Sequence, residues 1–240
     1  MRKLLLPVLA LSAVFSPALY AADFSEKIKV AMESELRTER DKERDRNRKP
    51  AETLSFFGIE EDMKVLEIIP GGGWYTKLLA PTLKDKGQLY LSLGTKYMDK
   101  ELLASKSFSK VKLVGESDYE LENLDFDVEN IDAVLTFRNY HNFNEQERMH
   151  INKAAFDALK PGGVYGVVDH TRRHMQKKND ENGRRFDPVL AIKEIQQAGF
   201  AFVDYSDLHY KSDDELRFEV GRKTVRGNSD RFTLLFKKPE

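Results

Sequence analysis

Short apolar runs alternate with longer amphipathic segments over most of the chain. Runs of strand length lie at residues 64–69, 88–93, 111–114, 131–136 and 164–168. Segments with helical spacing of apolar residues lie between or before them, at residues 51–57, 74–83 and 145–159. Because strands that alternate with helices form right-handed βαβ units, this order predicts a parallel sheet with helices on both faces.

The pattern changes in the last third of the chain. Pro161-Gly162-Gly163 is predicted to end a helix before the fifth strand. A further helix is expected at residues 188–198, followed by apolar runs at 200–205 and 232–236 that we expect to pair antiparallel. A chain of 240 residues suits one domain with a single core.

The N-terminus has the pattern of a secretory signal peptide. Arg2 and Lys3 precede an apolar run at residues 4–15, and small residues follow at Ala21 and Ala22. We expect residues 1–21 to be removed after Ala21 and the mature protein to be periplasmic or extracellular, without a membrane span. An uncleaved N-terminal anchor is the alternative, although the run is shorter than the ~20 residues of a membrane span.

Residues 22–49 are expected to form a charged, amphipathic helical arm in front of a domain at residues 50–240. Asp23 and Glu26 have the spacing of a capping box, and Phe24, Ile28, Met32 and Leu36 fall near one helical face. Residues 33–49 carry many charges of both signs, which favours a solvated helix or linker over a binding arm. The pattern assigns this arm no chemistry.

Composition excludes several classes of function. The chain has 39 basic and 40 acidic side chains, so no global attraction to nucleic acid or to anionic lipid is expected. It has no cysteine, which excludes thiolate catalysis and cysteine-based metal sites. The expected partner is a small-molecule or peptidic substrate, bound at a local site.

A glycine-rich turn follows the first strand of the domain. The strand carries Glu67 near its end, and Pro70, Gly71, Gly72 and Gly73 lead into the next helix. Glycines let the backbone approach a ligand closely, and the first turn of a helix offers unpaired N–H groups. In an open parallel sheet, ligands bind at this edge. The alternative is that the glycines only make a tight turn.

The turn resembles the first motif of the class I S-adenosylmethionine-dependent methyltransferases, in which a strand, an acidic residue and three glycines at alternate positions follow one another. Glu67, Gly71 and Gly73 match, whereas Ile69 stands at the first glycine position. Further stretches resemble a family of exported, predicted methyltransferases: Arg48-Lys49-Pro50, Phe56-Phe57-Gly58-Ile59, Pro70 to Thr76 with Leu79-Ala80-Pro81, Asn139-Tyr140-His141-Asn142, Asp169-His170 and Arg226 to Phe232.

The resemblance implies a Rossmann-like fold with seven mostly parallel strands, an antiparallel C-terminal strand and helices on both faces. It also implies S-adenosylmethionine as the cofactor, held by Glu67, the turn from Pro70 through Gly71, Gly72 and Gly73, and Asp118 near the adenine. The alternative for Asp118 is an exposed acid in a loop. Leu93 stands where these enzymes usually carry a ribose-binding acid. Ile69 adds a side chain where close backbone approach to the cofactor is normally needed, so both departures are expected to weaken cofactor binding.

Polar residues follow the fourth and fifth strands. The resemblance places Tyr75, Asn139 and His141 on the acceptor side, where the histidine would take a proton from the substrate. The alternative is a histidine held by packing. Asp169 and His170 lie at the same edge, but their spacing to His141 matches no metal-ligand motif, so no metal is expected.

Two more polar segments stay open at this point. The basic stretch at residues 172–185 is either a lid that attracts an acidic substrate or a solvated loop, and the latter is favoured. Asp230 and Arg231 either make a simple turn or reach the cleft. We expect methyl transfer to a small or peptidic acceptor. The rival is a non-catalytic periplasmic binding protein on the same scaffold, since fold alone does not determine function.

Overall fold

The computed structural model describes residues 17–240, and side chains from residue 24 onward. The expected signal peptide therefore lies mostly outside the described residues. Within the described part, no helix combines the length and the apolar character that a membrane crossing needs.

The helices and strands follow the predicted order closely. The strands are β1 Lys64–Ile68, β2 Gln88–Ser92, β3 Lys112–Leu113, β4 Ile131–Phe137, β5 Leu159–His170, β6 Ala201–Ser206 and β7 Arg231–Lys237. The helices are α1 Pro17–Met32, α2 Glu39–Lys42, α3 Asp45–Arg48, α4 Pro50–Phe56, α5 Thr76–Leu83, α6 Lys100–Ala104, α7 Glu145–Ala158 and α8 Pro188–Gln197, with single 3₁₀ turns η1 Thr95–Tyr97, η2 Lys106–Phe108 and η3 Tyr140–Asn142.

All seven strands form one sheet in the order β3-β2-β1-β4-β5-β7-β6. Strands β1 to β5 pair in parallel, and β7 is antiparallel to both β5 and β6. The strand order reverses between β1 and β4, so the carboxyl ends of these two strands define the switch point of the sheet. The predicted Rossmann-like architecture is confirmed.

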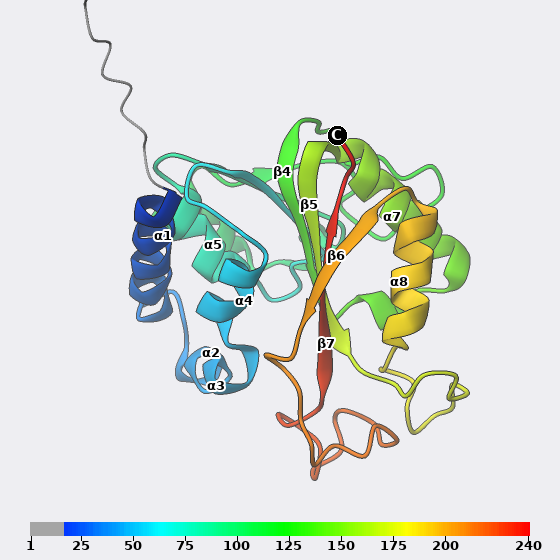
Figure 1. The fold of residues 1–240 in the computed structure, drawn as a ribbon. Helices are drawn as coiled ribbons and strands as arrows, with labels where there is room; N and C mark the ends of the chain where they lie inside the picture. Colours follow the sequence, from blue (N-terminus) through cyan, green and yellow to red (C-terminus); the bar gives the residue numbers. More distant parts are fainter. Residues whose placement is uncertain (1–16) are drawn as a thin grey trace, which may run out of the picture.

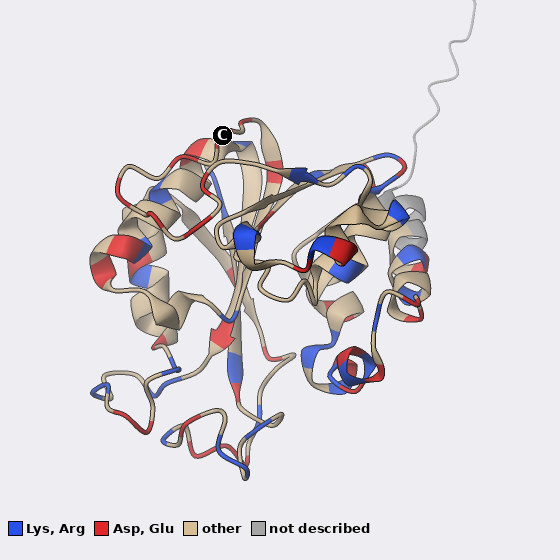
Figure 2. Cartoon of the chain, turned by 180° about the vertical axis from the view of Figure 1, so that it is seen from behind, with Lys and Arg blue, Asp and Glu red and all other residues tan. Residues whose placement is uncertain are grey.

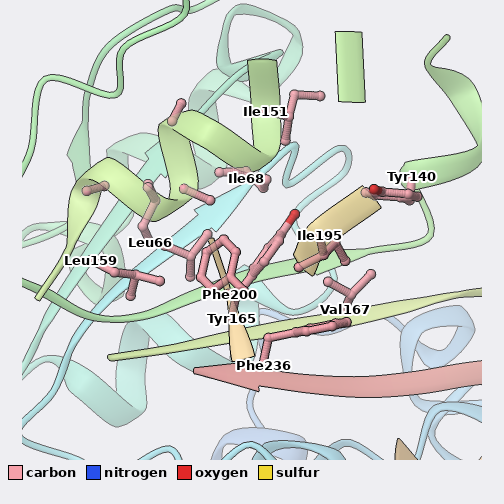
Figure 3. Packing of buried hydrophobic residues seen from close by; sticks show 14 of the residues in the cluster. Leu66, Ile68, Tyr140, Ile151, Leu159, Tyr165, Val167, Ile195, Phe200 and Phe236 are labelled. Carbon is pink, nitrogen blue, oxygen red and sulfur yellow. The ribbon is translucent and has the colours of Figure 1, made fainter. Parts of the chain in front are cut away.

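Helices cover the two faces of the sheet, and each layer has its own apolar cluster (Figure 1). On one side Phe24 and Ile28 of α1 pack with α4 and α5 against the sheet. On the other side Ile151 of α7 and Ile195 of α8 pack on the strands, as Figure 3 shows around Tyr165. Burying these side chains on both faces explains why the strands are continuously apolar rather than alternating.

Two local predictions were wrong. Asp23 lies inside α1, which already includes Pro17, so it does not cap the helix. Pro161-Gly162-Gly163 does not separate helix from strand, since β5 begins at Leu159 and accommodates the motif where its pairing with β4 shifts register.

The carboxyl ends of β1, β4 and β5 lie at the lower end of the sheet in Figure 1, and three distant parts of the chain gather there. They are α2 and α3, the segment between β5 and α8, and the segment between β6 and β7. The Arg231 guanidinium joins two of these parts, because its Nη1 donates to the Asn47 carbonyl oxygen over 2.7 Å. The charged arm is therefore part of this edge of the molecule.

Candidate functional site

Three neighbouring strands end in the same way at this edge. Ile69, Leu93 and Arg138 each follow a strand and have φ angles of 58°, 60° and 65°. Each residue still donates its backbone N–H to the next strand or segment, to Ser92, Glu116 and Val168 respectively. A left-handed conformation is costly for residues with a Cβ, so its repetition at three strand ends marks a site held under strain.

The glycine-rich turn lies directly beside these strand ends. Gly71 and Gly73 have φ angles of +56° and +72°, which glycine tolerates best. A Cβ added to Gly71 or Gly72 would meet no atom within 4 Å, whereas one added to Gly73 would meet Leu102 at 3.1 Å. Pro70 is buried and accepts the Gly73 N–H through its carbonyl oxygen. The turn leaves open space against its backbone, as a ligand cradle requires.

Glu67 lies behind the turn rather than in it. Its carboxylate is only 3% exposed and accepts a 2.6 Å hydrogen bond from the Thr76 hydroxyl in the first turn of α5. Burial raises the pKa of Glu67 to about 7, against the opposing effects of Thr76 and Arg48. Glu67 therefore ties β1 to α5 and is close to half ionised at neutral pH.

The two departures from the methyltransferase motif do not project side chains into a cleft. Leu93 is fully buried and Ile69 is 8% exposed, and both pack in the apolar cluster under α7 and α8. The expectation that Ile69 blocks backbone approach is therefore wrong. Both residues have αL backbone conformations, and both side chains lie in the core.

Asp118 lies near the carboxyl end of β2. Its carboxylate forms an ion pair with Lys96 and accepts a 3.0 Å hydrogen bond from the Tyr97 hydroxyl. Its backbone carbonyl oxygen accepts the Gly94 N–H. The hydrogen bond from Lys96 lowers its pKa, which keeps Asp118 ionised. Tyr97 and Tyr119 stack beside it with ring centroids 5.9 Å apart, so this corner offers aromatic and acidic surface together.

Tyr75 is not free to meet a substrate. It is 4% exposed, its ring stacks on Phe137 at 3.6 Å, and its hydroxyl donates to the Arg48 carbonyl oxygen over 3.3 Å. Burial raises the pKa of Tyr75 to about 12, so it stays neutral. The structure assigns Tyr75 a positioning role, holding the arm against α5.

Asn139 and His141 occupy the turn after β4, but each has a protein partner. The Asn139 amide donates to the carbonyl oxygens of Ile69 and Phe137, both over 3.0 Å, and so joins the ends of β1 and β4. The His141 Nδ1 lies 2.7 Å from Asp169 Oδ1. Because a carboxylate only accepts, this contact assigns a proton to Nδ1, and in the neutral imidazole Nε2 then has the lone pair.

Asp169 organises the end of β5. It is fully buried, and besides the His141 ring it accepts the backbone N–H groups of His141 and His170 over 2.8 and 2.7 Å. His141 borders a cavity of about 210 Å³ that Phe143, Arg172 and Phe186 also line. A buried carboxylate that fixes one imidazole nitrogen and leaves the other free is the arrangement of a general base.

His170 lines a second and larger cavity, of about 710 Å³. Its Nε2 accepts from Arg138 Nε over 3.1 Å, and its Nδ1 lies 2.9 Å from the Ser229 hydroxyl. Burial and the neighbouring Arg231 and Arg138 hold the pKa of His170 well below its ordinary value. His170 is therefore neutral and orients Arg138.

Arg48 is the main residue of this larger cavity that the pattern of the sequence missed. Arg48 and Arg231 are each 8% exposed and line the cavity together with Arg138. Arg48 lies in the arm that was expected to carry no chemistry, although it is the first residue of the Arg48-Lys49-Pro50 stretch in the resemblance. Its guanidinium stacks on the Trp74 ring at 4.3 Å, directly after the glycine turn. Arg231 does reach the edge of the sheet.

The segment at residues 172–185 is only partly solvated. Arg185 is 1% exposed and forms two hydrogen bonds with Asp214, of 2.8 and 2.9 Å, and Arg172 is 9% exposed. Arg185 therefore links this segment to the segment between β6 and β7. Among residues 24–240, no group of three or more histidines and carboxylates lies close enough together to hold a metal ion.

Comparison with solved structures identifies the fold. The chain superposes on a SAM-dependent methyltransferase from Aquifex aeolicus with a TM-score of 0.60, at 17% identity over 89% of this chain and 98% of that one. The CcbJ methyltransferase from Streptomyces caelestis gives 0.55, at 14% identity over 81% and 90%. The [4+2]-cyclase SpnF gives 0.59, at 14% identity over 92% and 94%.

No family model matches the sequence, and no curated protein matches it either. At these identities the likeness shows the fold alone, which is the class I methyltransferase fold over nearly the whole described chain. The chemistry must be argued from the site, particularly because the same fold includes a cyclase.

Proposed function

We propose that this protein transfers a methyl group from S-adenosylmethionine to a small or peptidic acceptor. The proposal rests on two features that lie at the ends of neighbouring strands, at the switch point of the sheet. An open glycine turn follows β1, and a histidine fixed by a buried aspartate follows β4 and β5. Open α/β sheets bind their ligands at this point.

The residues present fit the cofactor at the turn and at the β2 corner. Gly71 and Gly72 have free space against their backbone, which suits the amino-acid part of S-adenosylmethionine. Asp118 with the Tyr97 and Tyr119 rings suits the adenosine part. When bound, the cofactor supplies a methyl group made electrophilic by its sulfonium.

His141 would serve as the base on the acceptor side. Its Nε2 is free to take a proton from a hydroxyl or amine of the acceptor, and Asp169 stabilises the resulting imidazolium. Asn139 holds β1 and β4 at a constant separation, so the glycine turn and His141 keep their relative position. Tyr75 and Glu67 support this frame from behind.

A binding protein without catalysis is the second candidate. The observation that favours it is that the chain after β2 presents the buried Leu93 where methyltransferases usually carry an acid for the ribose hydroxyls. One charged-acceptor hydrogen bond is worth ~1.5–3 kcal/mol, so its loss alone weakens cofactor binding by tenfold or more.

We also propose that the protein is exported and acts in the periplasm or outside the cell, without nucleic-acid partners. Arg2, Lys3 and the apolar run at residues 4–15 support cleavage after Ala21. Mass spectrometry of the protein released by osmotic shock should find Ala22 at the N-terminus. An intact Met1 in the cytoplasmic fraction would contradict export.

Calorimetric titration with S-adenosylmethionine and S-adenosylhomocysteine tests the enzyme. We expect both to bind the wild-type protein and Gly72→Val to bind them at least tenfold more weakly. Gly72 is the sharper probe because its φ is ordinary and its Cβ would enter open space, so the variant should fold. Gly183→Val is the matched control, since its Cβ would lie 3.5 Å from the Asn179 carbonyl oxygen, outside the turn. A folded wild type that binds neither compound would leave the binding protein as the better candidate.

A further inference from the structure

The large cavity at the carboxyl edge of the sheet concentrates positive charge. Eight arginines and a single glutamate, Glu43, line its volume of about 710 Å³. Basic and acidic positions are otherwise interspersed over the fold, as Figure 2 shows, and the chain as a whole has a net charge of -1. The concentration is therefore local to this cavity, whose volume suits a small molecule.

The arginines form a floor and a rim. Arg48, Arg138 and Arg231 are the floor, of which Arg48 and Arg231 are each 8% exposed. Arg40, Arg46 and Arg226 are exposed at the rim. The floor residues come from α3, the end of β4 and the start of β7, so the tertiary fold brings together three cations that are far apart in sequence.

The floor arginines have no anionic partner among the described residues. Arg138 donates to the neutral His170, Arg231 donates to the Asn47 carbonyl oxygen, and Arg48 stacks on Trp74. The Nε atom of Arg231 is buried without any hydrogen-bond acceptor. A buried guanidinium normally has a carboxylate or an equivalent set of acceptors, because its desolvation is costly.

The nearest carboxylates are engaged elsewhere. Asp169 accepts three N–H groups from His141 and His170, and Asp230 accepts the Lys211 N–H over 2.8 Å. Burial, together with the charge of Arg138, lowers the pKa of Arg48 to about 9 and that of Arg231 to about 10. The three cations repel one another, and the pKa of Arg231 stays lowered although the charges of Asp169 and Asp230 oppose the shift.

We propose that the floor of this cavity binds the carboxylate or phosphate group of the acceptor, so that the substrate is a small acidic molecule. The planar forks of three arginines match the oxygens of such groups. The position also fits, because Arg48 packs on Trp74, the residue after the glycine turn. The assignment to the acceptor rests on the proposed methyl transfer, whereas the anion site itself does not.

The test measures anion binding directly, with the purified protein and four variants. Pyrophosphate and succinate are titrated by calorimetry, with sodium chloride at equal ionic strength as the reference. We expect at least one of the two to bind, and Arg231→Gln and Arg138→Gln each to weaken that binding at least tenfold. Arg217→Gln is the matched control, since Arg217 is exposed and pairs loosely with Glu215 at 3.9 Å. It should bind within twofold of the wild type.

Thermal unfolding without added anion separates lost binding from lost folding. Removing one of three mutually repelling cations should leave the melting temperature unchanged or raise it. Arg231→Lys keeps the charge but loses the planar guanidinium, so its affinity for the anion should lie between those of the wild type and Arg231→Gln. Failure of both anions to bind the folded wild type, or equal binding by wild type and Arg231→Gln, would overturn the site.

S-adenosylmethionine titrated into the same variants identifies which molecule brings the anion. The proposal expects its affinity for Arg231→Gln to stay within threefold of the wild type. A loss parallel to that of pyrophosphate or succinate would assign the arginines to the carboxylate of the cofactor and overturn the acceptor assignment. Binding of the anions by a wild type that does not bind S-adenosylmethionine would refute methyl transfer and leave the anion site standing.

Discussion

Replacing Glu67 by glutamine should change how the stability of the protein depends on pH. The folded pKa of Glu67 is about 7, raised by burial from the ordinary 4.5. Because the folded state holds this proton more tightly than the unfolded state, its contribution is fully present below pH 4.5 and is lost as the pH rises towards 7. The pKa difference corresponds to about 3 kcal/mol, which is a large share of the stability of a domain.

Glutamine keeps the shape of the side chain and still accepts the Thr76 hydroxyl, but it has no charge to bury. Relative to the wild type, Glu67→Gln should therefore gain about 3 kcal/mol in free energy of unfolding between pH 4.5 and pH 8. Urea unfolding at several pH values measures this difference. Glu120→Gln, at an exposed position, is the control and should follow the wild type. If Glu67→Gln also follows the wild type within ~0.5 kcal/mol, burial does not perturb Glu67 as argued.

Three further changes test other parts of the edge. Leu93→Asp should lower the free energy of unfolding, measured in urea, by ~3 kcal/mol or more, because it buries a carboxylate in the core. It should not tighten the binding of S-adenosylmethionine in calorimetry. Tighter binding would show that position 93 faces the ligand. Asp169→Asn should cost ~1–3 kcal/mol in the same unfolding assay, since the amide can no longer accept from all its N–H donors. Burial lowers the pKa of His209 to about 4, so the free energy of unfolding of the wild type should fall by about 3 kcal/mol between pH 6.5 and pH 4. In His209→Gln this fall should be smaller by about 3 kcal/mol. Equal falls in the two proteins would exclude His209 as the cause.

The sequence by itself determined the layers of the fold and the position of the ligand edge. Alternating apolar runs and amphipathic segments predicted every strand of the sheet, six of them to within about one residue and β5 with a start five residues too late. They could do so because strands buried on both faces must be apolar over their whole length. Glu67 and Gly71 to Gly73 stand next to a buried strand in the chain itself, so a local pattern could place the turn at the edge of the sheet.

The roles of individual side chains were decided only by the tertiary structure. Tyr75 was expected to face a substrate and instead packs on Phe137, because the arm that occupies its hydroxyl comes from a different part of the chain. Leu93 stands where the resemblance places a ribose-binding acid, but its side chain lies in the core and its backbone is αL directly after β2. The apolar periodicity of the sequence predicts neither the contacts between distant segments nor the φ angle of an individual residue.

The floor arginines, Arg48, Arg138 and Arg231, show most clearly the difference between what the sequence predicts and what the tertiary structure decides. In the sequence, Arg48 is one of many charges in a segment typical of a solvated helix, and Arg231 opens an ordinary strand. In the fold they share one cavity with Arg138, and each makes contact with residues from another part of the chain. Whether a charged side chain is solvated or buried depends on which distant segment covers it, and that is set by the packing of the whole sheet rather than by the residues around it in the chain.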